Sequence, residues 1–445
     1  GDVYKRQVNI RLFYLFIRLS IFKIRLPFLH HRFEWPDYLQ GLLMCAVDLA
    51  AIPLLMEILG MPFEVAVSVV ILNGLLYLTH SLLGDPVVPG WITPAIPIIV
   101  LYVENYEPGE DRIKALMAFQ FMLGFLSIFL GMSKLAKKII KLIPASIKSG
   151  VIVGAGISAI YTVFKDGGQF DSFPVTIFFA VGLAFYLIYS KHFSSLSSKN
   201  KIAHYIKNLG IFPIIIISVF VAPIFGESSL PNIEFGFTKV DFSSLINNFT
   251  IFGLGFPSLN MFITALPTVF ATYIVLFGDV LQSEALINEA KSHREDEKID
   301  YDSNRAHLIF GGRNTFMSFF GPDITMCGPM WAAMHVVIIE RFKLGIKSMN
   351  SIIGGNSSFR LGTNTGLLLL PIVSFVKPIL GVALALTLII QGFVSVRIGF
   401  KEAKSDSDIG IAGVIAAVLI TKGASWAFLV GIILVILLYG KDFLK

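Results

Sequence analysis

The sequence contains two stretches, Pro86-Val-Val-Pro-Gly-Trp-Ile-Thr-Pro94 and Phe319-Phe-Gly-Pro-Asp-Ile-Thr325, that each interrupt a long apolar run. In the first, Thr93 and Pro94 form an N-cap followed by a proline at the first helical position. In the second, Pro322 and Asp323 are expected to begin a helix in the same way. The helices that follow have about ten to sixteen residues, and at 1.5 Å per residue they are too short to cross ~30 Å of hydrocarbon. Both stretches therefore predict half-helices inside a membrane.

The composition supports this placement in a membrane. Of 445 residues, 55% are hydrophobic and 15% are charged, and the mean hydropathy is +0.75. Ordinary soluble domains carry about 25% charged residues. We therefore expect an all-α integral membrane protein whose main partner is the lipid bilayer. The net charge of +6 comes largely from short loops, so we interpret it as a topology signal and expect no nucleic-acid partner.

The apolar runs predict fourteen transmembrane segments. They cover about 39–60, 63–83, 94–103, 113–132, 143–164, 173–190, 209–226, 262–290, 303–318, 323–339, 348–375, 377–397, 407–421 and 424–440. The loops between them alternate in charge, with basic loops such as 134–141 and 191–207 on one side and the acidic loop 104–111 on the other. Because cytoplasmic loops are rich in Lys and Arg, we predict a multi-pass protein of the plasma (inner) membrane with both termini in the cytoplasm.

The two halves of the sequence correspond. Pro94 follows Asp48 by 46 residues, and Pro322 follows Asp279 by 43 residues. A repeat of seven spans is odd in number, so the second copy must be inverted in the membrane, as in many secondary transporters. We therefore expect a seven-plus-seven inverted repeat in which 86–93 and 318–322 are extended and approach each other near the bilayer centre.

These boundaries divide the chain into four parts. They are a cytoplasmic amphipathic segment (1–38), repeat 1 (39–226), an extracellular linker (227–261) and repeat 2 (262–445). Within the first part, residues 8–30 mix apolar and basic side chains, which predicts a helix lying on the membrane surface.

Four carboxylates lie within apolar runs, where each charge costs roughly 2.5–3.5 kcal/mol on insertion scales. We expect them to face a cavity beside the two interruptions. The residues predicted to take part in coupling are Asp48, Asp279, Gln282 and Glu284. The residues predicted to bind substrate are Trp91, Thr93, Phe320, Gly321, Asp323 and Thr325. Two alternatives stay open, because Asp323 can act only as a helix cap and Asp279 can simply bond a neighbouring helix.

Several short motifs resemble the nucleobase/ascorbate transporter family, which includes the bacterial uracil permeases. The matching residues are Leu39-Gln40-Gly41-Leu42-Leu43, Ile52-Pro53-Leu54-Leu55, Gly90, Ile143-Pro144 with Gly150, Gly154 and Gly156, Phe320-Gly321, and Pro378-Ile379-Leu380-Gly381. The family's acid after the aromatic-glycine pair stands one place later here, at Asp323. The resemblance implies a core domain (39–132 and 262–375), a gate domain (143–226 and 377–440) and a homodimer.

By this resemblance the protein is a proton-coupled importer of a nucleobase or similar small heterocycle, with Asp323 accepting hydrogen bonds from the ring. It needs no cofactor, and H⁺, or else Na⁺, is the coupling ion. The sulfate and bicarbonate transporters are similar in fold, so an anion substrate is the main alternative. A passive channel and an intramembrane aspartyl enzyme using Asp279 and Asp323 are more distant ones, and we expect no enzyme activity.

Overall fold

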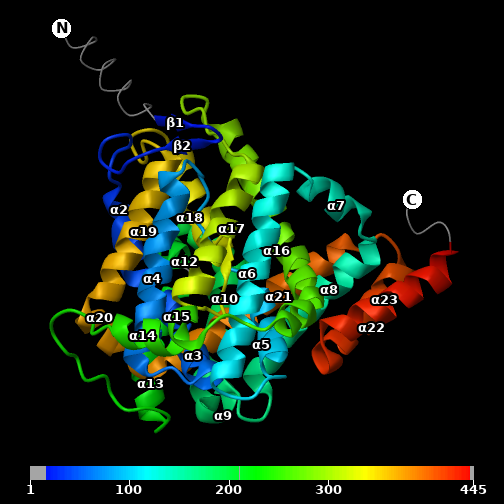
Figure 1. Cartoon of the computed structure of the whole chain (residues 1–445). Helices are drawn as coiled ribbons and strands as arrows, with labels where there is room; N and C mark the ends of the chain where they lie inside the picture. Colours follow the sequence, from blue (N-terminus) through cyan, green and yellow to red (C-terminus); the bar gives the residue numbers. More distant parts are fainter. Residues whose placement is uncertain (1–16, 210, 441–445) are drawn as a thin grey trace.

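The computed structural model describes residues 17–209 and 211–440 and is mostly helical (Figure 1). The first half of the chain contains β1 (Ile17–Leu19), β2 (Phe22–Ile24), α2 (Trp35–Leu49), α3 (Ile52–Leu59), α4 (Phe63–Leu82), β3 (Gly90–Trp91), the 3-10 helix η1 (Thr93–Ala95), α5 (Ile96–Val103), α6 (Glu110–Ser133), α7 (Ala136–Leu142), α8 (Ala145–Phe164), α9 (Gln169–Ser172), α10 (Pro174–Tyr189), α11 (Lys191–Lys199), α12 (Lys201–Asn208) and α13 (Phe212–Ile224).

The second half repeats the interrupted pattern. It contains α14 (Phe242–Phe249), α15 (Ile251–Leu254), α16 (Leu259–His293), α17 (Ser303–Phe320), β4 (Cys327–Gly328), α18 (Ala332–Lys343), α19 (Ile352–Leu368), α20 (Leu370–Val376), the 3-10 helix η2 (Lys377–Ile379), α21 (Leu380–Glu402), α22 (Asp406–Lys422) and α23 (Ala424–Tyr439). Helices α14 and α15 occupy the predicted linker.

Within the described residues, six helical segments are long and apolar enough to cross a membrane. A seventh span results if the bent pair α10 and α11 is counted as one. The half-helices are too short to pass such a test, and α17 and α19 carry buried arginines that lower their hydropathy. The chain is a multi-pass membrane protein, while the count of fourteen spans is not confirmed.

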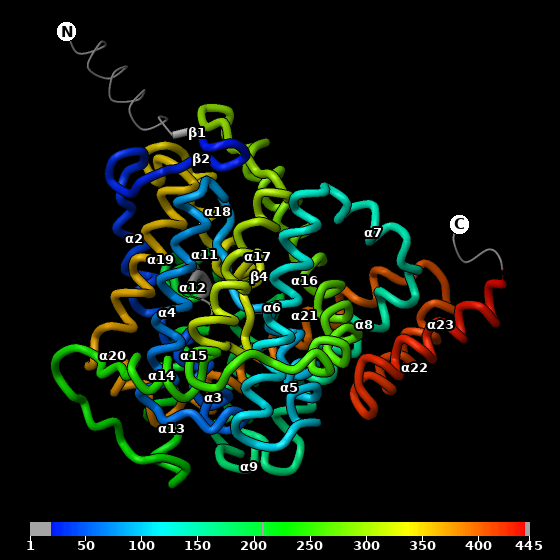
Figure 2. Tube along the Cα trace, in the orientation of Figure 1, coloured from blue at the N-terminus to red at the C-terminus, as the bar shows by residue number. Residues whose placement is uncertain are grey.

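Close contacts through glycine join the long helices. A Cβ on Gly41 of α2 would lie 2.0 Å from the carbonyl oxygen of Phe359 on α19, and one on Gly124 of α6 would lie 2.9 Å from that of Gly311 on α17. Without side chains at these positions, the backbones approach closely, which is how membrane helices commonly pack. Figure 2 shows α2, α4 and α19 running side by side.

Two strands of two residues each pair with one another in the interior of the bundle. Gly90 pairs with Gly328 and Trp91 pairs with Cys327 in the antiparallel pair β3–β4. The predicted extended segments therefore meet, but the second was placed wrongly. Residues 318–320 still belong to α17, and the non-helical backbone runs from Gly321 to Trp331.

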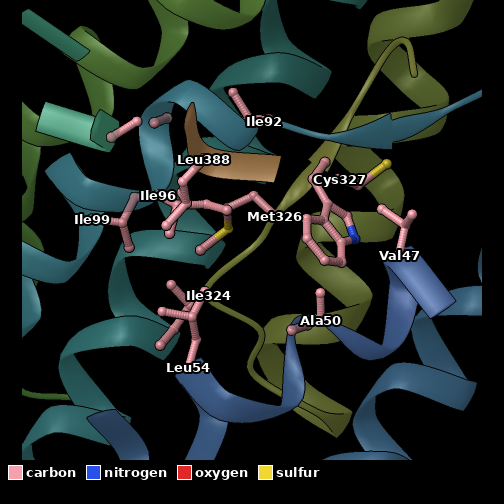
Figure 3. Close-up of a cluster of buried hydrophobic side chains, with 14 of the residues drawn as sticks. Val47, Ala50, Leu54, Ile92, Ile96, Ile99, Ile324, Met326, Cys327 and Leu388 are labelled. Carbon is pink, nitrogen blue, oxygen red and sulfur yellow. The ribbon is translucent and has the colours of Figure 1, made fainter. Parts of the chain in front are cut away.

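The second half-helix consequently starts at Ala332 rather than near Asp323. The Asp323 side chain accepts hydrogen bonds from the backbone N–H and the hydroxyl of Thr325 at 2.9 and 2.7 Å. Such local bonds compete with helix formation. Met326 adopts a left-handed φ of 52°, and Pro329 restricts the residue before it. Figure 3 shows Ile324 and Met326 packed among Ile96, Ile99 and Leu54, so an apolar cluster holds this irregular segment.

The predicted surface helix over 8–30 is wrong for its described part. Residues 1–16 lie outside the described residues, and 17–24 form the hairpin β1–β2, in which Ser20 has a positive φ of 54°. The hairpin caps one end of the bundle, whereas α9, α13 and α14 lie near the other end (Figure 1). The backbone N–H groups of Lys23 and Arg25 donate hydrogen bonds to the carbonyls of Leu83 and Leu82 at the end of α4.

Ion pairs fasten the hairpin to the segment between α16 and α17. Asp300 lies 2.8 Å from the Lys23 ammonium and 2.7 Å from the Arg305 guanidinium. Partial burial opposes ionisation of Asp300, but the hydrogen bonds from both cations outweigh it and lower its pKa to about 2. This end of the bundle is therefore held by charge-assisted contacts.

Candidate functional site

A small cavity lies beside the strand pair β3–β4 and has a volume of about 50 Å³. The first interrupted segment contributes Trp91 and Thr93 to its wall, and the second contributes Trp331 and Ala332. The remaining polar side chains of its wall are Asp48 of α2, Asp279 and Gln282 of α16, and Thr387, Gln391 and Ser395 of α21. The cavity thus joins both halves of the chain.

Both half-helices begin at this cavity. Thr93 and Pro94 open η1, which continues into α5, and Ala332 is the first residue of α18. The first backbone N–H groups of a helix have no partner within it and carry a partial positive charge. Two such helix ends at one cavity favour a ligand with negative charge or several hydrogen-bond acceptors.

Hydrogen bonds beside the strand pair β3–β4 set the relative position of the two helix starts. The Trp331 N–H donates to the carbonyl of Val88 at 2.7 Å, and the Ile92 N–H donates to that of Thr325 at 3.1 Å. A Cβ on Gly90 would lie 2.7 Å from the Cβ of Trp331. Only glycine permits this approach, so Gly90 lets the two segments meet at the cavity.

Asp48, in contrast, has a cationic partner. Its carboxylate lies 3.3 Å from the guanidinium of Arg360 on α19, and both side chains are buried. Arg360 also donates to the carbonyl of Pro89, and it lies 4.0 Å from the centre of the Tyr77 ring. The negative charge of Asp48 is therefore balanced from behind the cavity wall.

Five polar side chains of the wall have no such partners. Thr93, Asp279, Gln282, Gln391 and Ser395 make no side-chain hydrogen bond or ion pair with the residues that the structure describes. Thr93 and Ser395 are buried and the other three are half-buried, and buried polar groups are normally hydrogen-bonded. Unused donors and acceptors gathered at one cavity therefore mark a place for a polar ligand.

Asp323 does not belong to this wall, contrary to the prediction that it binds substrate. It is buried, and its carboxylate also accepts from the Asn73 amide at 2.6 Å, while its own N–H donates to Gln120 at 3.1 Å. Three hydrogen bonds occupy most of the acceptor capacity of the carboxylate. Asp323 thus holds the non-helical segment through Thr325 and Asn73, nine residues before α18 begins.

The other predicted residues of this stretch are also directed elsewhere. Phe320 packs on Phe316 and Phe252, with ring centres 4.5 and 5.4 Å away. Gly321 faces Leu72 and Met317, and Thr325 donates two hydrogen bonds to the Asp323 carboxylate. These three residues are not among those that line the small cavity, because the non-helical segment continues ten residues beyond Gly321.

Glu284, predicted to take part in coupling, forms a partly exposed ion pair with Lys137 of α7 at 2.8 Å. It lies five positions after Asp279 on α16, on a different helix face. The structure therefore brings together Asp48, Asp279, Gln282, Trp91 and Thr93, and it separates Glu284 from them.

Sequence reasoning missed the buried arginines. Arg313 of α17 lies 3.9 Å from the Tyr77 ring centre and donates to the side chain of Asn73 at 2.7 Å and to Cys327. Arg360 shares the same tyrosine ring. Both arginines stand inside predicted spans, which is the same signal that identified the carboxylates. The missed cavity tryptophan, Trp331, had a signal too, because each interruption contains a glycine, a proline and a tryptophan.

A second, larger cavity of about 1120 Å³ adjoins the small one. The two share Gln282, Trp331, Thr387 and Gln391 in their walls. The larger cavity is also bordered by residues 194–201 of α11 and α12, most of them exposed. We call it the vestibule, since it connects the small cavity with the basic loop region.

No metal centre is evident in the part of the chain that the structure describes, since no three His, Cys, Asp or Glu side chains are grouped there as ligands. The polar groups at the small cavity suit direct binding of a small solute instead.

The site thus consists of two half-helices whose N-termini lie at one cavity. The sequence matches no protein-family model and no curated protein sequence. Its fold is similar to that of the transmembrane domain of a cyanobacterium bicarbonate transporter, BicA, with a TM-score of 0.54 at 14% identity over 89% of this chain and 96% of that one.

It is also similar to the murine Solute Carrier 26 family member A9 anion transporter in its inward-facing state. That match has a TM-score of 0.53 at 15% identity over 91% of this chain and 68% of the other. At such identities the comparison establishes the fold alone. The fold is thus shared with two membrane transporters, and membership of the nucleobase/ascorbate family is not confirmed.

Proposed function

We propose that this protein is a secondary transporter of a small anion and that the anion moves together with a cation held at Asp279. The observation that carries the proposal is the meeting of both half-helix N-termini at one cavity. The fold is shared with a bicarbonate transporter and an anion transporter, which supports the same substrate class.

The electrostatics of the cavity explain the need for a cation. Arg360 balances Asp48, but Asp279 has no cationic partner in the described structure. At an effective dielectric of about 20, two like charges ~4 Å apart repel by about 4 kcal/mol. A proton or Na⁺ on Asp279 removes this repulsion, so anion and cation bind together.

The size of the cavity favours an anion over a nucleobase. A water-sized group needs roughly 10–15 Å³ in such a cavity, so 50 Å³ holds about four of them, close to bicarbonate. A ring with eight non-hydrogen atoms would extend beyond the small cavity into the adjoining vestibule. The nucleobase hypothesis also loses the acceptor that it requires, since Asp323 lies outside the wall.

Transport by alternating access requires a division into two bodies. Helices α2, α4, α6 and α16–α19 pack mainly among themselves, as do α8, α10, α13 and α21–α23, which supports the predicted core and gate domains. The vestibule borders the basic segment 191–201, so it faces the cytoplasm if the positive-inside rule holds. We further propose an inward-open state, cytoplasmic termini, insertion in the plasma (inner) membrane and a homodimer.

Uptake into proteoliposomes tests the proposal. Purified protein reconstituted into sealed vesicles is expected to concentrate labelled bicarbonate or sulfate when an inward Na⁺ or proton gradient is imposed, and not in its absence. Uracil and xanthine serve as the comparison. Accumulation of a nucleobase without accumulation of any anion would contradict the proposal.

A further inference from the structure

One wall of the small cavity is formed by a single face of α21. Thr387, Gln391 and Ser395 follow one another at four-residue intervals and all line the cavity. Residues four apart lie on the same face of a helix. Helix α21 falls in the predicted gate domain, whereas the two helix N-termini fall in the core domain, so the cavity has polar groups on both bodies.

A tight crossing with α8 fixes the orientation of this face. A Cβ on Gly392 would lie 2.6 Å from the carbonyl oxygen of Gly156, and one on Gly399 would lie 2.6 Å from the side chain of Val153. These glycines therefore turn toward α8. Gly392 directly follows Gln391 in the sequence. The contact of the two glycines with α8 therefore holds α21 in the rotation that leaves Gln391 at the cavity.

The three polar residues differ in what they can donate. The Thr387 hydroxyl donates to the carbonyl of Ala383 at 2.8 Å, so it has no hydrogen left for a ligand. The Gln391 amide and the Ser395 hydroxyl have no partner among the described residues. Donors at a cavity wall that remain unused are available to a ligand with matching acceptors.

We propose that Gln391 and Ser395 form the gate-domain half of the substrate site and that this half selects a polyatomic oxyanion over a halide. The inference rests on the proposed function and deepens it. An oxyanion carries acceptors on several atoms, so it receives bonds from the helix N-termini and from α21 at once. A halide is a single atom, and it leaves part of a cavity of about 50 Å³ unfilled and some donors unpaired.

The test compares labelled sulfate and bicarbonate uptake with inhibition by chloride in proteoliposomes. Loss of one hydrogen bond to a charged ligand costs about a tenfold factor in affinity. Gln391→Leu and Ser395→Ala are therefore each expected to raise the KM for the oxyanion about tenfold, while the inhibition constant of chloride changes less than twofold. The mild Ser395→Ala change keeps the test valid if Gln391→Leu fails to fold, as judged by gel filtration.

Thr387→Val is the matched comparison, because it removes a hydroxyl from the same helix face whose hydrogen is already used. An equal rise in KM for Thr387→Val would overturn the inference, since general polarity rather than donated bonds would then matter. Unchanged KM in the other two variants, or a wild-type protein that binds chloride as well as oxyanions, would also overturn it. If the wild-type protein carries no anion at all, it is the proposed function that fails.

Discussion

Asp279 and Asp323 are both carboxylates within the membrane-spanning bundle, yet their surroundings are opposite. Asp323 is buried and accepts three hydrogen bonds, from Asn73 and from the N–H and hydroxyl of Thr325. Asp279 borders a cavity and has no partner in the described structure. A satisfied polar group stabilises the fold, whereas an unsatisfied one at a cavity is free to bind a ligand. The difference agrees with the proposal that Asp279, and not Asp323, takes part in transport.

The largest stability effect is expected at Arg360, whose guanidinium is paired with the buried Asp48 carboxylate. Arg360→Leu leaves Asp48 buried without its cation, which costs about 3–5 kcal/mol of unfolding free energy. Thermal unfolding in detergent measures this loss. The double variant Asp48→Asn, Arg360→Met should recover part of it, and a single variant that melts within a degree of the wild type would refute the assignment.

A somewhat smaller loss is expected for Asp323→Ala. The amide of Asn73 and the hydroxyl of Thr325 then lose their shared acceptor, at a cost of about 3 kcal/mol. Asp279→Asn, which breaks no bond in the described structure, serves as the control and should change the unfolding temperature little. Equal melting of the two variants would remove the distinction between the carboxylates.

The ion pairs of Asp300 extend the comparison outside the membrane, where pH can be varied. The folded-state pKa of about 2 lies below the ordinary value of about 3.9, so this carboxylate contributes stability above pH 4 and loses it as the pH falls toward 2. Hydrogen exchange of the β1–β2 hairpin should therefore increase over this range. Asp300→Asn should show the faster exchange already at neutral pH; protection independent of both changes would contradict the role of the pair.

The smallest effect is expected for Glu284, whose pair with Lys137 is partly exposed. Exposed ion pairs contribute about 0–1 kcal/mol. Glu284→Gln should thus alter neither the unfolding temperature nor transport by a measurable amount. A loss of coupled uptake in this variant would restore the coupling role predicted from sequence.

Much of the architecture follows from periodicity and composition. The interruption at 86–94 and its half-helix were predicted correctly because proline, glycine and an N-cap act locally. The second interruption was placed too early because Pro322 and Asp323 give the same local signal. Tertiary hydrogen bonds from Asn73 to Asp323 and the pairing of Gly90 with Gly328 decide its extent, and neither can be derived from local sequence.

The candidate site was only partly accessible from sequence for a similar reason. Asp48 and Asp279 were singled out because charge in an apolar run is conspicuous, and Gln282 because it lies three residues after Asp279. Gln391 and Ser395 are ordinary residues of an apolar helix, and their position depends on how Gly392 packs against Gly156. The pairing that balances Asp48 depends on Arg360, 312 positions away. Packing between distant helices thus determines which polar residues share a cavity.

Coupled uptake by the Asp279→Asn variant tests the central claim most directly. In proteoliposomes with an imposed Na⁺ or proton gradient, the wild-type protein is expected to concentrate labelled anion above equilibrium. The variant, which has lost the charge that requires a cation, should exchange internal for external anion at a similar rate but should accumulate none. If Asp279→Asn still concentrates the anion as the wild type does, then Asp279 does not hold the coupling cation.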